Sequence, residues 1–256
     1  MKKILIFIFL LLIISSCHKN TENEFKTLIN NYPHNDNLFE EYESEYNKTK
    51  NIIYSINKVN YPSFLVPKSF NNLAFNINNV WLVNTNFTLS KGFIPKNLVP
   101  VSNVDYVKRN NEQMLINEKA LIAYQQLYQA ALLENLELML FSAYRSYDYQ
   151  EALYNKKDNT YIASPGASEH QTGCALDIAI SATGLTSHFD NTVEAKWLMN
   201  NAYKYGFIQR YKSNKQNITG YPYESWHYTY VGESIAENIH KMDLTLEEYF
   251  YQYILI

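Results

Sequence analysis

The chain has 256 residues, of which 46% are hydrophobic and 18% charged, so it can bury a sizeable core and does not have the composition of a disordered protein. Its 22 basic and 25 acidic residues give a net charge of −3, and this balance argues against a nucleic-acid partner. With two cysteines, a disulfide scaffold and a cysteine-rich zinc module are excluded.

The N-terminal segment has the pattern of an export signal. Two lysines in residues 1–3 precede an apolar run over residues 4–14, which is too short for the ~20 residues that a transmembrane helix needs. Ser16 directly precedes Cys17, and this arrangement resembles the lipobox of bacterial lipoproteins. The resemblance implies that residues 1–17 are a lipoprotein signal and that Cys17 is lipidated and becomes the mature N-terminus. A plain secretory signal with an incidental cysteine is the alternative, and the protein is exported in both cases.

Residues 18–60 are rich in Asn, Glu, Lys and Tyr and contain few aliphatic residues. This composition suits a tether between a lipid anchor and a folded domain. It also suits a helical arm packed on that domain, with a helix within residues 37–54. We leave both open and expect the folded domain to cover residues 61–256.

Periodicity predicts alternating helices and strands in this domain. Glu118 to Asn135 has apolar residues at helical spacing, whereas Ala175 to Ile180 alternates as a strand does. The absence of a regular strand–helix–strand rhythm favours an α+β fold over a doubly wound sheet. The remaining expected strands are 80–83, 98–101, 136–142 and 226–231, and the remaining expected helices are 147–155, 193–205 and 235–242.

Two short segments carry residues that suit a hydrolytic zinc site. Such a site needs three protein ligands, an open position for water and a carboxylate that is not a ligand. His170, Asp177 and His227 can fill the three ligand positions, and Glu224 can act as the base. As alternatives, strand alternation could point Asp177 to solvent, and Cys174 could be a soft ligand; we favour a small buried hydrophobe for the cysteine.

Arg145 follows the expected strand that ends at Ser142, so it lies at the start of a loop, where functional residues concentrate. Its planar guanidinium suits a carboxylate such as the C-terminus of a peptide. Taken alone, the residue fits a surface salt bridge better than a substrate contact.

Taken together, these motifs resemble the VanY-type zinc D-alanyl-D-alanine carboxypeptidases and the related L,D-carboxypeptidases. The motifs are Ser-x-x-Arg at Ser142, Ser-x-His-x6-Asp at Ser168 and Glu-x-Trp-His at Glu224, in this order. The resemblance runs from about residue 82 to residue 249. It implies a small, mostly antiparallel sheet flanked by helices, with a zinc site in a cleft on the sheet.

The resemblance also implies a role for each matched residue. His170, Asp177 and His227 correspond to the ligands of one Zn²⁺ ion, and Glu224 to the general base. Arg145 corresponds to the family arginine that contacts the substrate near the scissile amide and the terminal carboxylate.

Three further positions, Ser142, Gln150 and Ser168, correspond to residues that line the pocket for the terminal D-Ala. Two positions depart from the family pattern: Ser225 stands where proline is usual, and Thr229 where arginine is usual. Neither is a ligand, and we expect Thr229 to bear on the packing behind the site or on the choice of substrate.

We therefore expect an exported, lipid-anchored, monomeric zinc D-alanyl-D-alanine carboxypeptidase that trims peptidoglycan stem peptides on the outer face of a bacterial cytoplasmic membrane. Its partners would be these peptides and, through Cys17, the membrane. The alternatives are an L,D-carboxypeptidase acting on tetrapeptide stems, an endopeptidase of the same superfamily, and a lipoprotein that binds cell-wall peptide without cutting it.

Overall fold

The computed structural model describes residues 24–30, 36–50, 52, 55, 56, 59, 75–77, 80–108, 112–156 and 162–250. These belong to two compact units, one formed by Met1–Val66 with Tyr251–Ile256 and the other by Pro67–Phe250. The export signal and Cys17 lie outside the described residues. Within the described ranges, no helix combines the length and the apolar character that crossing a bilayer requires.

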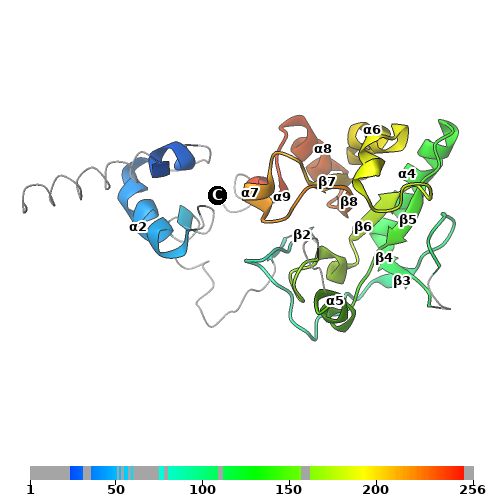
Figure 1. Cartoon of the computed structure of the whole chain (residues 1–256), viewed down its shortest axis with the longest axis horizontal. Helices are drawn as coiled ribbons and strands as arrows, with labels where there is room; N and C mark the ends of the chain where they lie inside the picture. The colour runs from blue at the N-terminus through cyan, green and yellow to red at the C-terminus, as the bar shows by residue number, and fades with distance from the viewer. Residues whose placement is uncertain are drawn as a thin grey trace, which may run out of the picture. The chain divides into compact units, whose positions relative to one another are not determined.

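The first unit contains helical segments held together by aromatic contacts. The ring of Phe25 lies 5.3 Å from that of Phe39 and 5.2 Å from that of Tyr46, and Tyr42 is fully buried. The helix expected within residues 37–54 is present as Phe39–Thr49. The helical segments are residues 24–29, η1 (Asp36–Leu38) and α2 (Phe39–Thr49) (Figure 1).

The second unit is built on a four-stranded antiparallel sheet with the strand order β5-β6-β8-β7. Two short hairpins, β1-β2 and β3-β4, are also antiparallel. The strands are β1 (Phe75–Ile77), β2 (Val80–Leu82), β3 (Leu98–Pro100), β4 (Leu115–Asn117), β5 (Met139–Ser142), β6 (Ala175–Ala179), β7 (Phe207–Tyr211) and β8 (Glu224–Tyr230). The helices are α4 (Glu118–Leu133), α5 (Tyr147–Tyr154), η2 (Glu169–Thr172), η3 (Ser187–Asn191), α6 (Val193–Asn201), η4 (Ala202–Tyr205), α7 (Gln216–Thr219), α8 (Glu233–Lys241) and α9 (Leu246–Tyr249).

The α+β class, the antiparallel sheet and the flanking helices are confirmed. The expected helix over residues 193–205 divides into α6 and η4, and Gly206 ends it in the left-handed conformation with a φ of 82°. Strands β1, β4 and β7 are not among the expected strands. Strand β7 is five residues long and contains Gln209 and Arg210, so it lacks a clean apolar alternation.

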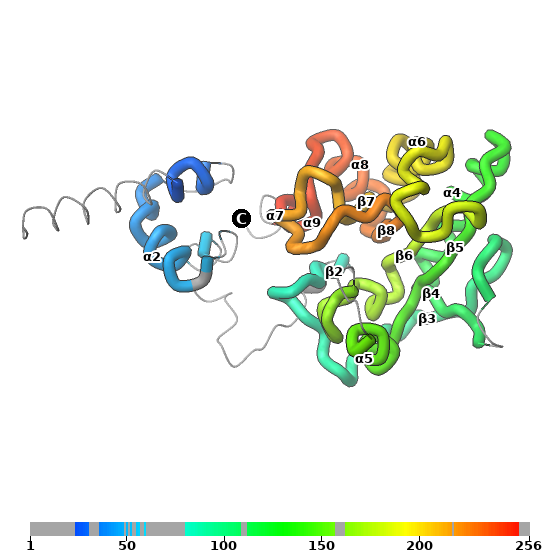
Figure 2. The backbone as a smooth tube through the Cα atoms, viewed as in Figure 1, coloured from blue at the N-terminus to red at the C-terminus, as the bar shows by residue number. Residues whose placement is uncertain are grey.

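The two faces of the sheet have different roles. On one face, Leu176 and Ile178 of β6 and Tyr228 of β8 join the main hydrophobic core with residues of α4 and α6. Figure 2 traces the backbone of these elements. Successive residues of a strand point to opposite faces, so Asp177 and His227 lie on the other face. The core therefore fixes which side chains the sheet presents to the site.

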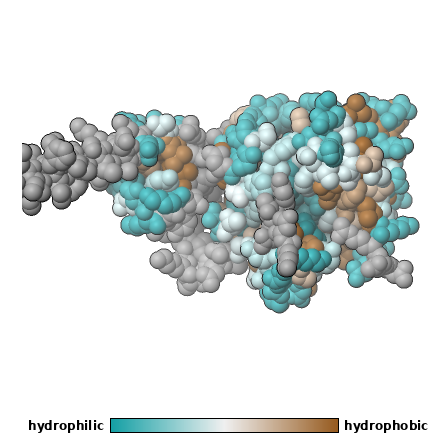
Figure 3. All heavy atoms as spheres, in the orientation of Figure 1, coloured by the Kyte–Doolittle hydropathy of each residue, from teal (hydrophilic) through white to brown (hydrophobic). Residues whose placement is uncertain are grey.

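The surface of the second unit is mostly hydrophilic on the face drawn in Figure 3, with hydrophobic patches on the side where α4 lies. Exposed apolar residues include Ile122 and Leu133 of α4 and Val193 and Met199 of α6. Single exposed apolar side chains are ordinary on folded proteins, so they carry no functional argument.

Candidate metal centre

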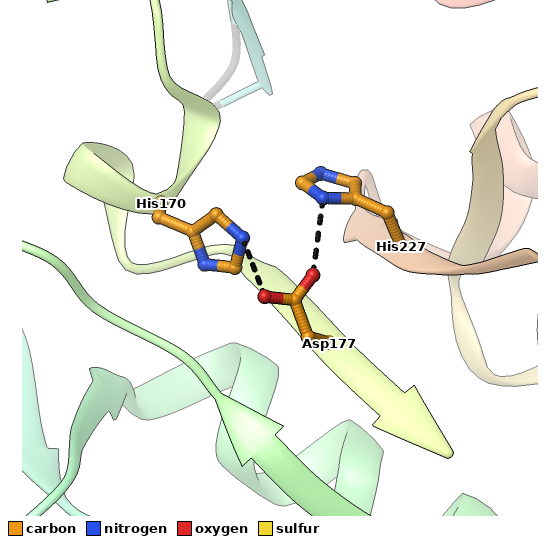
Figure 4. Close-up of side chains that lie close together, drawn as sticks. All are labelled: His170, Asp177 and His227. Carbon is orange, nitrogen blue, oxygen red and sulfur yellow. Dashed lines mark ion pairs between the residues drawn. The ribbon is translucent and has the colours of Figure 1, made fainter. Parts of the chain in front are cut away.

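Three residues predicted as metal ligands converge in the second unit. One ligand atom from each of His170, Asp177 and His227 lies within 4.8 Å of the others, and all three side chains are buried. The carboxylate of Asp177 lies between the two imidazole rings (Figure 4). Its Oδ2 is 3.2 Å from Nε2 of His170, and its Oδ1 is 3.3 Å from Nδ1 of His227.

Strand pairing brings two of these residues together. Strands β6 and β8 are antiparallel, and their register places Asp177 directly opposite His227. Directly opposed residues have Cβ atoms ~5 Å apart, so the register alone makes these side chains neighbours. Asp177 is 5% exposed, which excludes the alternative that strand alternation points it to solvent.

A short turn positions His170. It lies in η2, which ends at Gly173 with a φ of 72° before the chain enters β6. The positive φ requires glycine here, and a Cβ would also approach the backbone nitrogen of Asn117 to 3.1 Å. Nδ1 of His170 is 2.6 Å from the carbonyl oxygen of Ala143, which leaves Nε2 directed at Asp177.

Glu224 lies beside these residues although it is three positions from His227 on the same strand. Residues three apart in a regular strand point to opposite faces. The register between β7 and β8 shifts between Gln209 and Tyr211, and this irregularity lets both side chains line one cavity. Oε2 of Glu224 is 3.6 Å from Nδ1 of His227, and burial raises the pKa of Glu224 to about 7.

The pKa values of the other groups show how strongly burial and neighbouring charges act on the site. Burial and the charge of Arg145 lower the pKa of His170 to about 4. Burial also opposes ionisation of His227, but the nearby carboxylates of Asp177 and Glu169 outweigh it and raise the pKa to about 9. Burial disfavours the charged form of Asp177 as well, and the neighbouring histidines overcome this and hold its pKa well below the usual value.

Arg145 faces the same cavity. Its Nη2 is 3.7 Å from Oδ2 of Asp177, and its side chain is 19% exposed. Its backbone N–H donates to the carbonyl oxygen of His170, which ties the loop after β5 to the turn that carries the first histidine. A simple surface salt bridge does not describe this residue, because it lines the cavity that contains the three candidate ligands.

The cavity has a volume of about 190 Å³. Gln150 and Ser168 line it, as expected, and the amide of Gln150 donates to the carbonyl oxygen of Ala163 at 2.7 Å. Ser142 instead lines a neighbouring cavity of about 210 Å³, which Arg145 also borders. The volume of the main cavity is below the ~300 Å³ of a typical drug-sized pocket and suits a small group.

Several residues that shape the site were not predicted from the sequence. Tyr211, Tyr221, Trp226 and Leu185 line the cavity, and Glu169 and Arg210 form a buried ion pair behind it. An arginine within a strand that also carries phenylalanine, isoleucine and tyrosine was the available signal, because a buried arginine requires an acidic partner.

Cys174 does not belong to the group of candidate ligands found among the described residues. It is 7% exposed, and burial raises the pKa of its thiol to about 12. A thiol must lose its proton to bind a metal, so this environment favours the small buried hydrophobe.

The donor set fits zinc. Two imidazole nitrogens and one carboxylate oxygen form a three-ligand set of the kind found in catalytic zinc sites, which keep one position for water. Glu224 lies next to this set as a carboxylate outside it. The three candidate ligands and Glu224 all line the cavity, so a small substrate group inside it would reach them.

Comparison with known sequences agrees with this geometry. Residues 113–233 match the family model VanY: D-alanyl-D-alanine carboxypeptidase. VanXYC of Enterococcus gallinarum, a bifunctional D-Ala-D-Ala dipeptidase and carboxypeptidase, is 33% identical over 187 residues, which cover 68% of this chain and 94% of VanXYC. YodJ of Bacillus subtilis is 41% identical over 180 residues, and a D-alanyl-D-alanine carboxypeptidase of Enterococcus faecium is 40% identical over 108 residues. The chain spans 66% of the length of YodJ and 34% of the length of the Enterococcus faecium protein.

Solved structures of related peptidases also match this chain. The LdcB LD-carboxypeptidase matches with a TM-score of 0.63 and 36% identity, covering 73% of this chain and 97% of LdcB. A mutant of the vancomycin-resistance D,D-pentapeptidase VanY, solved with Zn(II), matches with a TM-score of 0.55 and 29% identity, covering 66% of this chain and 97% of the other.

Proposed function

The chain belongs to the VanY family of zinc-dependent D-alanyl-D-alanine carboxypeptidases, and from this premise we propose that it removes the C-terminal D-Ala from the stem peptides of peptidoglycan. The observation that carries the proposal is the convergence of His170, Asp177 and His227 beside Glu224 in one cavity. A binding protein without activity would not need a carboxylate outside the ligand set whose pKa lies near neutrality.

The chemistry follows from the positions of these residues. Zinc bound by the three ligands would supply a polarised scissile carbonyl and a water of lowered pKa. Glu224 is the base that takes the proton of this water and returns it to the leaving amine. Burial raises its pKa to about 7, which suits both steps near neutral pH.

Arg145 supports a carboxypeptidase rather than an endopeptidase. Its guanidinium lies at the edge of the cavity, 3.7 Å from Asp177, where it can bind a carboxylate through two parallel hydrogen bonds. A free C-terminus supplies such a group, whereas a residue inside a cross-link does not. The cavity volume of about 190 Å³ suits a small terminal residue such as alanine.

L,D-carboxypeptidase activity is the second candidate. It is favoured by the match to LdcB, an LD-carboxypeptidase, and by a further match to the L,D-carboxypeptidase DacB with a TM-score of 0.55. The two activities differ in the residue before the scissile bond, which lies outside the pocket for the terminal D-Ala. The same ligands, base and arginine would serve either activity.

Incubation of the purified protein with synthetic pentapeptide and tetrapeptide stems separates the two candidates. Mass spectrometry should show loss of one alanine from the pentapeptide, in a reaction that a zinc chelator stops and added zinc restores. Loss of alanine from the tetrapeptide alone would establish the L,D activity instead. No cleavage of either stem by the zinc-loaded protein would contradict the proposed function.

Metal analysis tests the ligand set separately. The parent protein should contain one zinc per chain, and His227→Ala should lose it because a catalytic site has no spare protein ligand. His188→Ala is the matched control, because His188 lies in the exposed turn η3. Equal zinc in His227→Ala and the parent would remove His227 from the ligand set.

We propose further that the protein is exported and anchored by a lipid on Cys17 to the outer face of the cytoplasmic membrane. The support is the sequence alone: the charged start, the apolar run over residues 4–14 and Ser16 directly before Cys17. Expression in a bacterial host should give a protein that partitions into detergent and carries diacylglycerol. Cys17→Ser should abolish both properties, and equal partitioning of the two proteins would contradict the anchor.

A further inference from the structure

Behind the candidate zinc site lies a buried group of charged residues, which we call the clamp: Arg210, Glu169 and Glu247. The guanidinium of Arg210 donates through Nε to Oε1 of Glu169 at 2.6 Å, and through Nη1 to Oε2 of Glu247 at 2.8 Å. The amide of Asn84 donates to Oε1 of Glu247 at 3.0 Å. The three charged side chains are at most 2% exposed.

The clamp leaves one carboxylate oxygen pointing toward the metal centre. Oε2 of Glu169 accepts a hydrogen bond from the hydroxyl of Thr229 at 2.5 Å and lies 3.6 Å from Nε2 of His227. The other ring nitrogen of His227, Nδ1, is the one that faces Asp177 at 3.3 Å. The imidazole of His227 therefore lies between the carboxylate of Asp177 and that of Glu169.

We infer that Glu169 is a positioning residue, which holds His227 with its proton on Nε2 and so keeps the lone pair of Nδ1 available to the metal. The inference rests on the zinc site of the proposed function. A histidine ligand commonly donates its second ring N–H to a carboxylate or a carbonyl oxygen, and this contact sets the tautomer and the orientation of the ring.

The two ligand histidines are held in opposite ways. Nδ1 of His170 contacts the carbonyl oxygen of Ala143, so its Nε2 faces the site. Nε2 of His227 contacts Glu169, so its Nδ1 faces the site. A neutral oxygen thus orients the first ring and a carboxylate the second.

Arg210 and Thr229 explain why this position requires a carboxylate and not an amide. Oε1 of Glu169 accepts from Arg210, while Oε2 accepts from Thr229 and faces Nε2 of His227 at 3.6 Å. An amide offers a single acceptor oxygen, and its NH₂ group would face either the guanidinium or the imidazole N–H. The substitution Glu169→Gln therefore preserves the shape of the side chain and loses one of these acceptor positions.

The first test measures metal affinity by competition with a chromophoric chelator. We expect Glu169→Gln to bind zinc about 10- to 100-fold more weakly than the parent, as loss of such supporting contacts commonly does. The matched control is Glu247→Gln, which removes a carboxylate from the same Arg210 without a contact to His227. It should lower the melting temperature and leave zinc affinity within about threefold of the parent, far from the loss expected at position 169.

The second test needs no variant and therefore holds even where Glu169→Gln does not fold. Long-range ¹H–¹⁵N NMR spectra of the zinc-loaded parent should show two metal-bound histidine rings with opposite tautomers. The Nε2 proton of the ring bound through Nδ1 should exchange slowly with water. Two rings of the same tautomer, or a rapidly exchanging proton, would overturn the inference.

The outcomes also separate this inference from the proposed function. Equal zinc affinity in Glu169→Gln and the parent, or equal weakening in Glu169→Gln and Glu247→Gln, would show that Glu169 does not position His227. Failure of the parent to bind zinc or to cleave either stem peptide would instead contradict the proposed function.

Discussion

The two arginines nearest the site differ in what surrounds them. Arg210 is fully buried and donates to the carboxylates of Glu169 and Glu247 at 2.5 to 2.8 Å. Arg145 is 19% exposed, lines the cavity, and has its Nη2 3.7 Å from the carboxylate of Asp177. The same functional group is thus enclosed by acidic side chains in one place and directed at a cavity in the other.

This difference separates an arginine that stabilises the fold from one that can bind a substrate. A buried guanidinium is tolerated only where carboxylates and hydrogen bonds compensate for its lost hydration, and Arg210 has this compensation within the fold. A guanidinium that borders a cavity can take its carboxylate from a substrate. Substitutions at Arg210 should therefore change stability first, and substitutions in the cavity should change activity first.

The largest effect should come from Arg210→Met. This change leaves the carboxylates of Glu169 and Glu247 buried without their cation, and breaking a buried ion pair in this way costs about 3–5 kcal/mol. Urea denaturation of the purified protein measures the loss. Lys91→Met is the control, because the pair of Lys91 with Asp148 is exposed to solvent and should contribute little to stability. Similar losses of unfolding free energy in both variants would contradict the expectation that the buried clamp contributes more to stability than a surface ion pair.

The next effect is on turnover. Glu224→Gln should keep the fold and the zinc but lower kcat by a factor of about 100 or more, because an amide cannot accept the proton of the attacking water. The rate of D-Ala release measures this, with Glu233→Gln on the exposed start of α8 as the control. Near-parental turnover of Glu224→Gln would mean that a different residue is the base.

A smaller effect should separate substrates with free and blocked C-termini. If Arg145 binds the terminal carboxylate, amidation of the stem peptide leaves the guanidinium without its charged partner at a cost of about 2 kcal/mol, or ~30-fold in kcat/KM. In Arg145→Met the ratio between the free acid and the amide should fall toward one. Equal rates for the two peptides in the parent would favour the endopeptidase alternative.

The last effect concerns the stability of the metal-free protein and appears only when the pH is changed. Burial raises the pKa of Glu224 from 4.5 to about 7, so the folded state favours the neutral carboxyl. The unfolded chain then binds fewer protons than the folded chain between these values, and stability falls as the pH rises from 4.5 through 7. Glu224→Gln has no charge to bury, so the metal-free variant should be more stable than the parent by up to about 3 kcal/mol at pH 8.

At pH 4 this advantage should disappear, because Glu224 is then neutral in both states. Denaturation of both proteins at pH 4 and pH 8 in the presence of a chelator provides the comparison. A difference in stability that does not change with pH would show that the carboxylate of Glu224 is not buried at a cost.

Residue types and spacing, together with the family that they resemble, predicted the candidate site. A histidine seven residues before an aspartate, followed much later by Glu-x-Trp-His, identified the three residues that converge and the carboxylate beside them. The helix from Glu118 was equally readable, because its apolar residues recur at helical spacing over four turns and Asn117 caps its first turn. The helical spacing and the segment 168–177 are local patterns, so both can be recognised from the sequence without a structure.

What the tertiary structure decided depends on pairings between distant segments. The β6–β8 register places Asp177 opposite His227, and the irregular β7–β8 pairing brings Glu224 into the same cavity. Arg210 meets Glu169, 41 residues earlier, and Ser142 turns to a different cavity from Gln150 and Ser168. Local propensity contains no information on strand register, and a shift of one residue would have moved every side chain to the other face. The sequence alone therefore determined which residues could perform the chemistry, and the packing of the sheet determined which of them meet and what holds them in place.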